Sequence, residues 1–313
     1  MGKDMRQVYT ETLIDLASVN KDICVLEADL MGATGTKPFK EAYPERAFNV
    51  GVAEANLVGV ASGLSSEGKI PFAATFGTFA SRRAFDQFFL SANYAQLNVK
   101  LVGTDPGVTA QFNGGTHMPF EDVGMMRLIP NLTIVEPCDT VSCEQIIRLA
   151  ADHKGSMYIR MHRKGSQTLY PEDQKFELGK GIVLKDGRDV TLIAAGFVMV
   201  PQALKAAEML EKEGISAAVI DMHTIKPLDE DLVLSYAKKT GCIVTCENHQ
   251  VIGGLGGAVA ELLSREYPAY MRMIGAQDQF GQVGTLDFLM EEYKLTAKDI
   301  VSAAKEVLQK KNK

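Results

Sequence analysis

Continuous apolar runs of strand length recur along the whole chain, and segments of helical character separate them. The runs are DICVLEADL, NVKLVGTD, LTIVEPCD and MYIRMHR in the first half, and DVTLIAAG, SAAVIDMHT and GCIVTCEN in the second. Helices are expected at about residues 4–18, 137–151, 198–213, 229–239 and 254–266. Strands that are apolar on both faces and joined by helices form parallel sheets covered on each side. The pattern predicts an α/β fold with doubly wound sheets.

A polar segment without periodicity divides the chain into two parts. The segment KGSQTLYPEDQKFELGKG, residues 164–181, contains one proline and three glycines, which is typical of a linker. A chain of 313 residues is long enough for two domains, each with its own core. We therefore expect a first domain over residues 1–165, a linker over 166–181 and a smaller α/β domain over 182–313.

Composition argues against several classes of partner. The net charge is −6, and lysine and arginine are spread along the chain without a basic block, which argues against a nucleic-acid or membrane-surface partner. No apolar run approaches the roughly 20 residues that span a bilayer. The charged N-terminal segment does not resemble a secretory signal, and the five cysteines include no C-x-x-C pair. We expect a reduced, cytoplasmic protein.

Three unusual segments follow predicted strands, where open α/β sheets bind their ligands. Glu54 lies in the first turn of a predicted helix after strand 47–50, although helix capping also favours an acid there. Phe76 and Phe79 can share one helical face, although core packing would also explain them. His117 stands in the long glycine-rich loop TDPGVTAQFNGGTHMPFED, where a functional and a structural role are equally open.

Several common motifs are missing from the sequence. No Cys/His grouping has zinc spacing, and neither G-x-S-x-G nor a Walker loop occurs. The segment GGLGG, residues 253–257, opens a predicted helix but lacks the full dinucleotide fingerprint, so close packing explains it better. The residues alone therefore indicate a two-domain α/β enzyme with a candidate cleft.

Four segments together resemble the transketolase family, in order and over nearly the whole chain. They are VGVAEANLVG, PFAATFGTF, GGTHMPFEDVGMMRLIPNLTIVEP and CENHQVIGGLGG. The resemblance covers the pyrimidine-binding and C-terminal domains, whereas the family's N-terminal domain, with its G-D-G…N signature for metal and diphosphate, has no counterpart. It implies the second subunit of a split transketolase that shares thiamine diphosphate with an N-terminal partner subunit. That partner would bind Mg²⁺ or Ca²⁺, and self-association through this chain would give an α₂β₂ assembly.

The resemblance also implies which residues contact the cofactor. Glu54 matches the glutamate that meets N1′ of the aminopyrimidine and shares a proton with it. Phe76 and Phe79 match the aromatic wall on which the pyrimidine stacks. Asp29 matches an acid that contacts the cofactor across the subunit interface, although it could equally cap the turn after its strand. Family members often carry a third aromatic residue where this chain has Arg82.

Substrate-binding residues are implied in the same way. His117 matches the histidine that bonds the substrate and moves protons at its hydroxyl. Arg163 and Arg6 match arginines that clamp the phosphate of the substrate, and a solvated surface arginine is the alternative for each. Asp105 stands in place of a family histidine, and Asn113 in place of an acid that recognises the donor's stereochemistry. These changes imply a non-standard sugar, such as a branched, modified or sulfonated one.

We therefore expect transfer of a two-carbon ketol unit from an anionic ketose to an aldose. One alternative is the β-type subunit of another thiamine-dependent enzyme, such as a 2-oxoacid dehydrogenase or a deoxyxylulose-phosphate synthase. An oxoacid decarboxylation assay would distinguish such a subunit from a transketolase. The other is a non-catalytic subunit that only completes an interface, against which the retained Glu54 and His117 argue. His249 in the C-terminal segment is expected to be a packed or interface residue.

Overall fold

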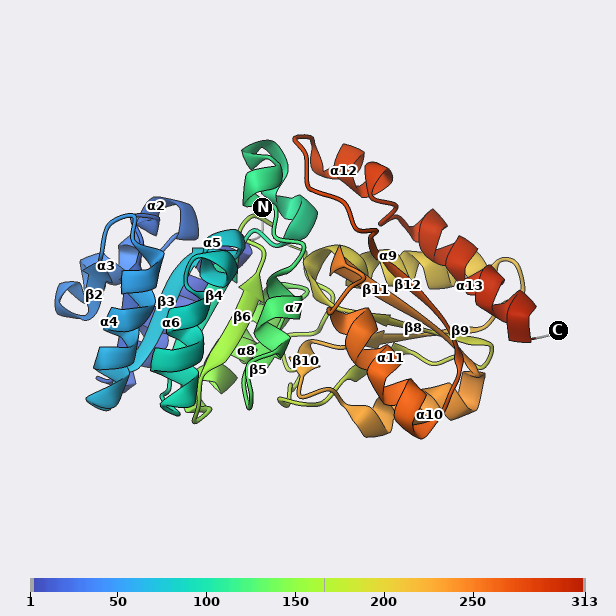
Figure 1. The fold of residues 1–313 in the computed structure, drawn as a ribbon, viewed down its shortest axis with the longest axis horizontal. Helices are drawn as coiled ribbons and strands as arrows, with labels where there is room; N and C mark the ends of the chain where they lie inside the picture. Colours follow the sequence, from blue (N-terminus) through green and yellow to red (C-terminus); the bar gives the residue numbers. More distant parts are fainter. Residues whose placement is uncertain (1–2, 166, 312–313) are drawn as a thin grey trace.

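Two sheets of mainly parallel strands lie side by side, and helices cover both faces of each (Figure 1). The computed structural model describes residues 3–165 and 167–311. The first sheet has the strand order β10-β5-β6-β4-β3-β1-β2, and the second has the order β12-β11-β8-β9-β7. The predicted α/β class with two sheets is confirmed.

The first part of the chain contains the strands β1 (Ile23–Glu27), β2 (Ala47–Asn49), β3 (Ile70–Phe76), β4 (Lys100–Thr104), β5 (Thr133–Val135) and β6 (Met157–Met161). Its α-helices are α1 (Met5–Val19), α2 (Met31–Thr34), α3 (Lys37–Ala42), α4 (Glu54–Ser66), α5 (Gly77–Arg82), α6 (Phe85–Gln87), α7 (Asp122–Arg127) and α8 (Thr140–Asp152). A π-helix, η2 (Phe88–Tyr94), and three short 3₁₀ segments, η1 (Pro44–Arg46), η3 (Gly107–Asn113) and η4 (Gly115–His117), complete it.

The second part contains the strands β7 (Ile182–Lys185), β8 (Val190–Ala194), β9 (Ala217–Asp221), β10 (Thr224–Lys226), β11 (Cys242–Gln250) and β12 (Tyr270–Ala276). Its helices are α9 (Gly196–Glu211), α10 (Glu230–Thr240), α11 (Leu255–Glu266), α12 (Leu286–Glu292) and α13 (Ala297–Lys311). The predicted helices at 198–213, 229–239 and 254–266 thus lie within two residues of α9, α10 and α11.

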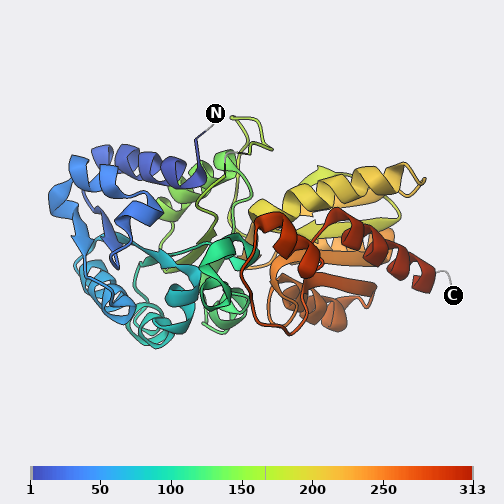
Figure 2. The ribbon, with the colours of Figure 1, turned by 90° about the horizontal axis from the view of Figure 1, so that it is seen from above.

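Strand β1 illustrates why apolar and polar residues do not alternate along the predicted strands. Ile23 and Val25 pack in one apolar cluster with α1 and α8, whereas Cys24 and Leu26 pack in another with α4 and η2. Successive side chains of a strand point to opposite faces, so a strand covered on both faces is apolar at every position. Figure 2 shows this layering, with α1 (dark blue) on one side of the first sheet and residues 77–94 (light blue to teal) on the other.

Several elements were not expected from the sequence. Strand β10 comes from the second half of the chain but pairs antiparallel with β5 in the first sheet, and β7 pairs antiparallel with β9. A strand of three residues such as β10 is too short to show a period, so its pairing partner decides its position. Within the described part of the linker, residues 167–181, there is no helix or strand. Residue 166 lies outside the described residues, and the domain boundaries remain a prediction.

A fully buried arginine links the two parts of the chain. Arg160 on β6 donates from Nε to Asp122 Oδ2 at 2.8 Å and from Nη1 to Glu136 Oε1 at 2.8 Å. Its Nη2 donates to the backbone oxygen of Asn248 on β11 at 2.7 Å. Burial alone would raise the pKa of Asp122, but the Arg160 charge holds that pKa below its usual value. The network therefore ties β11 of the second sheet to β6 of the first.

Cys24, Cys242 and Cys246 are free and buried, as expected for small core residues. His249 is also buried, and its Nε2 accepts a hydrogen bond from the backbone N–H of Gly124 at 3.2 Å, which agrees with the predicted packing role.

Among residues 3–165 and 167–311, no helix combines the length and the apolar character needed to cross a membrane.

Candidate active site

Most of the predicted site residues follow the carboxyl ends of neighbouring strands in the first sheet. Asp29, Asp105 and Arg163 come shortly after β1, β4 and β6, and Phe76 ends β3. Because these strands are parallel, their carboxyl ends lie along one edge of the sheet. Arg6 reaches the same edge from α1, since its backbone N–H donates to the carbonyl oxygen of Arg163 at 3.1 Å.

Glu54 is a buried acid at the first position of α4. Its side chain is 5 % exposed, and the residue before it, Ala53, supplies no side-chain cap. Among the described residues, its carboxylate receives one hydrogen bond, from Arg83 Nη1 to Oε1 at 3.0 Å. Arg83 follows the last residue of α5, and its side chain is 53 % exposed. The acid thus lies under the surface with one solvent-facing cation as its partner.

Three aromatic rings lie beside this ion pair. The ring centroids of Phe76 and Phe79 are 5.9 Å apart, and the His117 ring meets Phe79 edge-on at 5.1 Å and Phe76 at 6.0 Å. The Arg83 guanidinium carbon lies 4.0 Å from the centre of the Phe79 ring, within range of a cation–π contact. Phe79 therefore contacts His117 directly and is linked to Glu54 through Arg83.

Two arginines converge at the other end of the aromatic group. Arg163 lies with its guanidinium carbon 4.9 Å from the centre of the Phe76 ring, and its Nη1 donates to the backbone oxygen of Ala33 at 3.0 Å. Arg6 Nη1 donates to the same oxygen at 3.2 Å. Asp105 is buried, and both its oxygens accept from Arg163 Nε, at 2.8 and 2.7 Å. Two cationic groups therefore meet at one carbonyl oxygen, where Arg163 pairs with Asp105 and Arg6 pairs with Asp4.

The remaining predicted residues lie further out. Asp29 is exposed and bonded to Asn49 Nδ2 at 3.2 Å, and both line a surface pocket of about 680 Å³. Asn113 is exposed at the end of η3, with no side-chain hydrogen bond to the described residues.

Backbone strain is concentrated in this region. Asp29, Asp105 and Gln111 have φ values of 62°, 56° and 47°, which L-residues rarely adopt, and Gln111 combines its value with ψ −117°. Such conformations cost of order 1–3 kcal/mol each and cluster at binding and catalytic sites. The loop that carries His117 is therefore held in a conformation that propensity alone would not favour.

Arg83 is the site residue that the sequence analysis missed. The neighbouring Arg82, which stands in place of the family's third aromatic residue, pairs instead with Glu121 at 3.1 Å. The available signal was spacing: Arg83 lies four residues after Phe79, where helical side chains meet. A cation placed one turn after an aromatic residue of the candidate wall is a pattern that the sequence displays.

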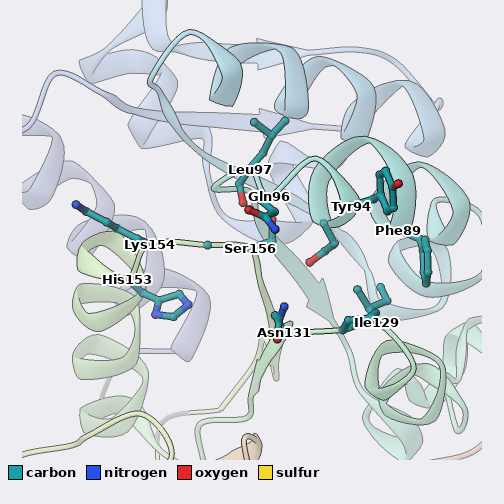
Figure 3. A pocket seen from close by; sticks show the side chains of 12 residues that line it. Phe89, Tyr94, Gln96, Leu97, Ile129, Asn131, His153, Lys154 and Ser156 are labelled. Atoms are coloured by element: carbon teal, nitrogen blue, oxygen red, sulfur yellow. The ribbon is translucent and has the colours of Figure 1, made fainter.

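A different hollow lies at the opposite edge of the first sheet. A pocket of about 850 Å³ is lined by residues that precede β4, β5 and β6, among them Leu97, Asn131 and Ser156 (Figure 3). Burial and the nearby Lys100 lower the pKa of His153 at its rim. Since it lies at the amino ends of the strands, this pocket is separate from the site at their carboxyl ends.

The fold defines a two-domain α/β protein, and its candidate site at one edge of the first sheet combines a buried acid, aromatic rings, a histidine and two arginines. The transketolase pyrimidine-binding domain matches residues 1–167, and the transketolase C-terminal domain matches residues 179–300. The chain therefore belongs to the transketolase family, and membership implies dependence on thiamine diphosphate.

Relatives of similar length support this assignment. The chain is 49% identical over 308 residues to the 6-deoxy-6-sulfo-D-fructose transketolase subunit SqwH of Clostridium sp. (strain MSTE9), covering 98% of this chain and 95% of that protein. It is 43% identical to a putative transketolase C-terminal section of Methanocaldococcus jannaschii, covering 98% and 97%. A solved split-gene transketolase, described as an inactive beta4 tetramer, superimposes with a TM-score of 0.92 at 46% identity, covering 98% and 99%.

The side chains of Glu54 and Phe79 suit the aminopyrimidine of thiamine diphosphate, as one contact in the structure indicates. The Arg83 guanidinium, a flat group with N–H donors, stacks on Phe79 and bonds Glu54 at the same time. A planar heterocycle can use the same ring face and the same carboxylate. No cluster of three or more metal-binding side chains occurs in the described ranges, and the prediction that a partner binds the metal stays untested.

Proposed function

We propose that this chain is the C-terminal subunit of a split transketolase, which transfers a two-carbon ketol unit from an anionic ketose to an aldose. One observation carries the proposal: Glu54, the two phenylalanines, His117 and Arg163 line one continuous stretch of the same sheet edge. When bound, thiamine diphosphate supplies the carbanion chemistry that breaks and forms a carbon–carbon bond beside a carbonyl.

Each residue along this sheet edge has its own role toward the cofactor or the substrate. Glu54 shares a proton with the ring nitrogen of the aminopyrimidine, and its burial keeps water from competing for that proton. Phe76 and Phe79 hold the ring by stacking, a contribution of about 0.5–1.5 kcal/mol beyond buried area. His117 moves a proton at the substrate hydroxyl, and Thr116 Oγ1, 3.0 Å from Nδ1, orients its ring.

The two arginines select a substrate with an anionic tail. Arg6 and Arg163 both reach the Ala33 carbonyl oxygen, so an anion beside that oxygen would contact two guanidinium groups. Guanidinium forks suit phosphate and sulfonate oxygens. Asp105 neutralises Arg163, which favours a singly charged sulfonate over a doubly charged phosphate. The name of the SqwH relative, a transketolase for a sulfonated fructose, supports the same substrate class.

A second, N-terminal subunit is proposed to complete the cofactor site. Large apolar side chains are exposed in three segments: Val52 at 74%, Phe112 at 70% and Phe280 at 98%. The loop that carries Phe280 packs closely on the His117 loop. The approach is so close that a Cβ on Gly115 would collide with the carbonyl oxygen of Gly281. Exposed apolar side chains on two loops that pack together, here Phe112 and Phe280, are typical of protein interfaces. Mg²⁺ or Ca²⁺ would be held by that subunit.

The assembly is proposed to be α₂β₂, formed by self-association of this chain, and exposed Asp29 is proposed to contact the cofactor of the neighbouring half. The tetramer in the description of the solved split-gene relative supports self-association. The cytoplasmic location and the absence of nucleic-acid partners remain predictions from composition.

Reconstitution tests this proposal. The chain is co-expressed with a subunit that carries the G-D-G…N motif, and donors with sulfonate, phosphate or no anionic group are compared for ketol transfer to an aldose. Transfer that requires both subunits supports the proposal. Decarboxylation of a 2-oxoacid without ketol transfer would favour the β-type subunit of another thiamine enzyme. Full activity of a Glu54→Ala assembly would favour a non-catalytic interface subunit.

A further inference from the structure

We infer that Glu27 is a positioning residue for the anion-binding arginines. Through the hydroxyl groups of Thr34 and Thr36, it holds the carbonyl oxygen of Ala33 at the point where the two arginines of the candidate site meet. The inference deepens the proposed function and rests on it, because the arginines are assigned there to the anionic tail of the substrate.

The carboxyl group of Glu27 anchors two hydroxyl groups at one oxygen atom. Glu27 is the last residue of β1 and is fully buried, as are Thr34 and Thr36. Its Oε1 accepts a hydrogen bond from Thr34 Oγ1 at 2.6 Å and another from Thr36 Oγ1 at 2.7 Å. Buried polar groups find their partners within the protein, so these bonds determine where the two threonines lie. Segment 34–36 is therefore tied to the end of β1.

This segment continues directly from the carbonyl group that the arginines share. Ala33 precedes Thr34, and its carbonyl oxygen accepts from Arg6 Nη1 at 3.2 Å and from Arg163 Nη1 at 3.0 Å. Both residues belong to the single turn of α2, so the carbonyl group of Ala33 moves with the backbone of Thr34. A displacement of Thr34 would therefore change the spacing of the two guanidinium groups.

Helix α1 holds the other side of the same segment. Arg6 and Thr10 are four residues apart on α1, so their side chains share one helical face. Thr10 Oγ1 donates to the carbonyl oxygen of Gly35 at 3.0 Å. Gly35 has a φ of 88°, and a Cβ there would lie 3.3 Å from the Arg6 carbonyl oxygen. The segment is thus held between α1 and the end of β1, and the Glu27 bonds fix the second of these contacts.

Packing alone does not explain an acid at this position. Burial raises the pKa of Glu27 to about 7, which shows that its charged form is disfavoured there. Its Oε2 has no hydrogen-bond partner among the described residues, so only one of its two oxygens is satisfied. An apolar side chain would fill the space without this cost. What the carboxyl group adds is one oxygen that accepts from two threonines, which it can do in either protonation state.

The test removes each hydroxyl group without changing the shape of the side chain. Thr34→Val and Thr36→Val replace the hydroxyl with a methyl group, and Thr34→Ser returns the hydroxyl. Thr191→Val is the matched control, because Thr191 is also fully buried and its hydroxyl pairs with Thr240 Oγ1 at 3.0 Å in the second part of the chain. Urea midpoints verify that every variant folds.

Two measurements separate anion binding from turnover. Steady-state kinetics of the assembly reconstituted with the partner subunit gives KM and kcat for an anionic and an uncharged ketose donor. Calorimetry on the full chain gives the dissociation constant of inorganic sulfate, which stands in for the anionic tail and needs neither cofactor nor turnover.

We expect each valine variant to raise the sulfate dissociation constant and KM for the anionic donor roughly three- to tenfold, the effect of losing one hydrogen bond. Within about twofold, kcat and KM for the uncharged donor should stay unchanged, since only binding of the anion is affected. Thr34→Ser should restore both constants toward wild type, and Thr191→Val should match wild type.

The outcomes distinguish the inference from the proposed function. Wild-type sulfate binding and wild-type KM in both valine variants would overturn the inference and leave the proposed function standing. An equal rise of KM for both donors would also overturn it, because a merely structural defect does not discriminate between them. Weakened sulfate binding in the variants of a chain whose assembly transfers no ketol unit would support the inference and overturn the proposed function.

Discussion

Arg163 and Asp105 form a buried ion pair at the edge of the candidate site, with side-chain exposures of 9% and 4%. The pair joins the ends of β6 and β4, two neighbouring strands, and holds the guanidinium beside the Phe76 ring. Asp105 adopts a left-handed φ of 56°, so the backbone as well as the side chain is adapted to this contact. The Arg163–Asp105 pair yields a stability prediction.

Asp105→Asn should lower the free energy of unfolding by about 3 kcal/mol, because Arg163 would stay buried without its charge partner. Asparagine tolerates the left-handed conformation, so the substitution changes the charge and leaves the backbone unstrained. Urea unfolding measures the effect. Asp15→Asn, which weakens an exposed pair with Arg148, is the control and should cost less than about 1 kcal/mol. Equal losses in the two variants would contradict a buried pair.

Arg6→Gln should raise KM for an anionic ketose donor about 10- to 100-fold, the range expected for losing a charge-assisted hydrogen bond of about 1.5–3 kcal/mol. KM for an uncharged ketose should stay within about twofold, since such a donor makes no contact with the guanidinium. Steady-state kinetics of the reconstituted assembly with both donors separates these outcomes. A parallel rise for both donors would place Arg6 in a structural role.

Most of the fold could be predicted because its strands are continuous apolar runs at the core of each sheet. The short edge strand β10 could not, since its pairing with β5 depends on tertiary contact. In the site, Phe79 and His117 stand out by residue type and loop context. The pairing of Asp105 with Arg163 involves residues 58 apart in the chain, and no local pattern encodes such a contact.

Glu27→Gln should remove part of the pH dependence of stability. Burial raises the pKa of Glu27 to about 7, although hydrogen bonds from Thr34 and Thr36 oppose the shift. Between about pH 4.3 and 7, the folded protein keeps a proton that the unfolded chain has lost, so the free energy of unfolding falls as pH rises and levels off above this window. The variant should avoid a loss of at most about 4 kcal/mol, at about 1.4 kcal/mol per pH unit.

Urea unfolding of Glu27→Gln at pH 5, 6, 7 and 8 measures this slope against wild type. Glu67→Gln, at an exposed position after α4, is the control and should follow wild type throughout. A variant whose stability falls with pH as steeply as wild type would mean that Glu27 does not hold its proton in the folded state.

Arg160→Met should destabilise the whole chain by about 3–5 kcal/mol, because Asp122 and Glu136 would remain buried without their cation. One of the hydrogen bonds between the two parts, to the Asn248 carbonyl oxygen, is removed as well. Urea unfolding followed by circular dichroism reports the loss. Arg265→Gln, from an exposed pair with Glu230, should change stability by less than about 1 kcal/mol. If Arg160→Met lowers the free energy of unfolding only slightly, the carboxyl groups of Asp122 and Glu136 must be neutral in the folded protein.

The most direct test of the account is turnover by Glu54→Gln in the assembly with the partner subunit. Glutamine keeps the size of the side chain and can still bond Arg83, but it cannot share a proton with a ring nitrogen. We predict a fall in kcat of at least about 100-fold, the scale of lost acid–base assistance, with an unchanged urea midpoint. Turnover within a few-fold of wild type, by a variant that still binds thiamine diphosphate, would contradict the central role of Glu54.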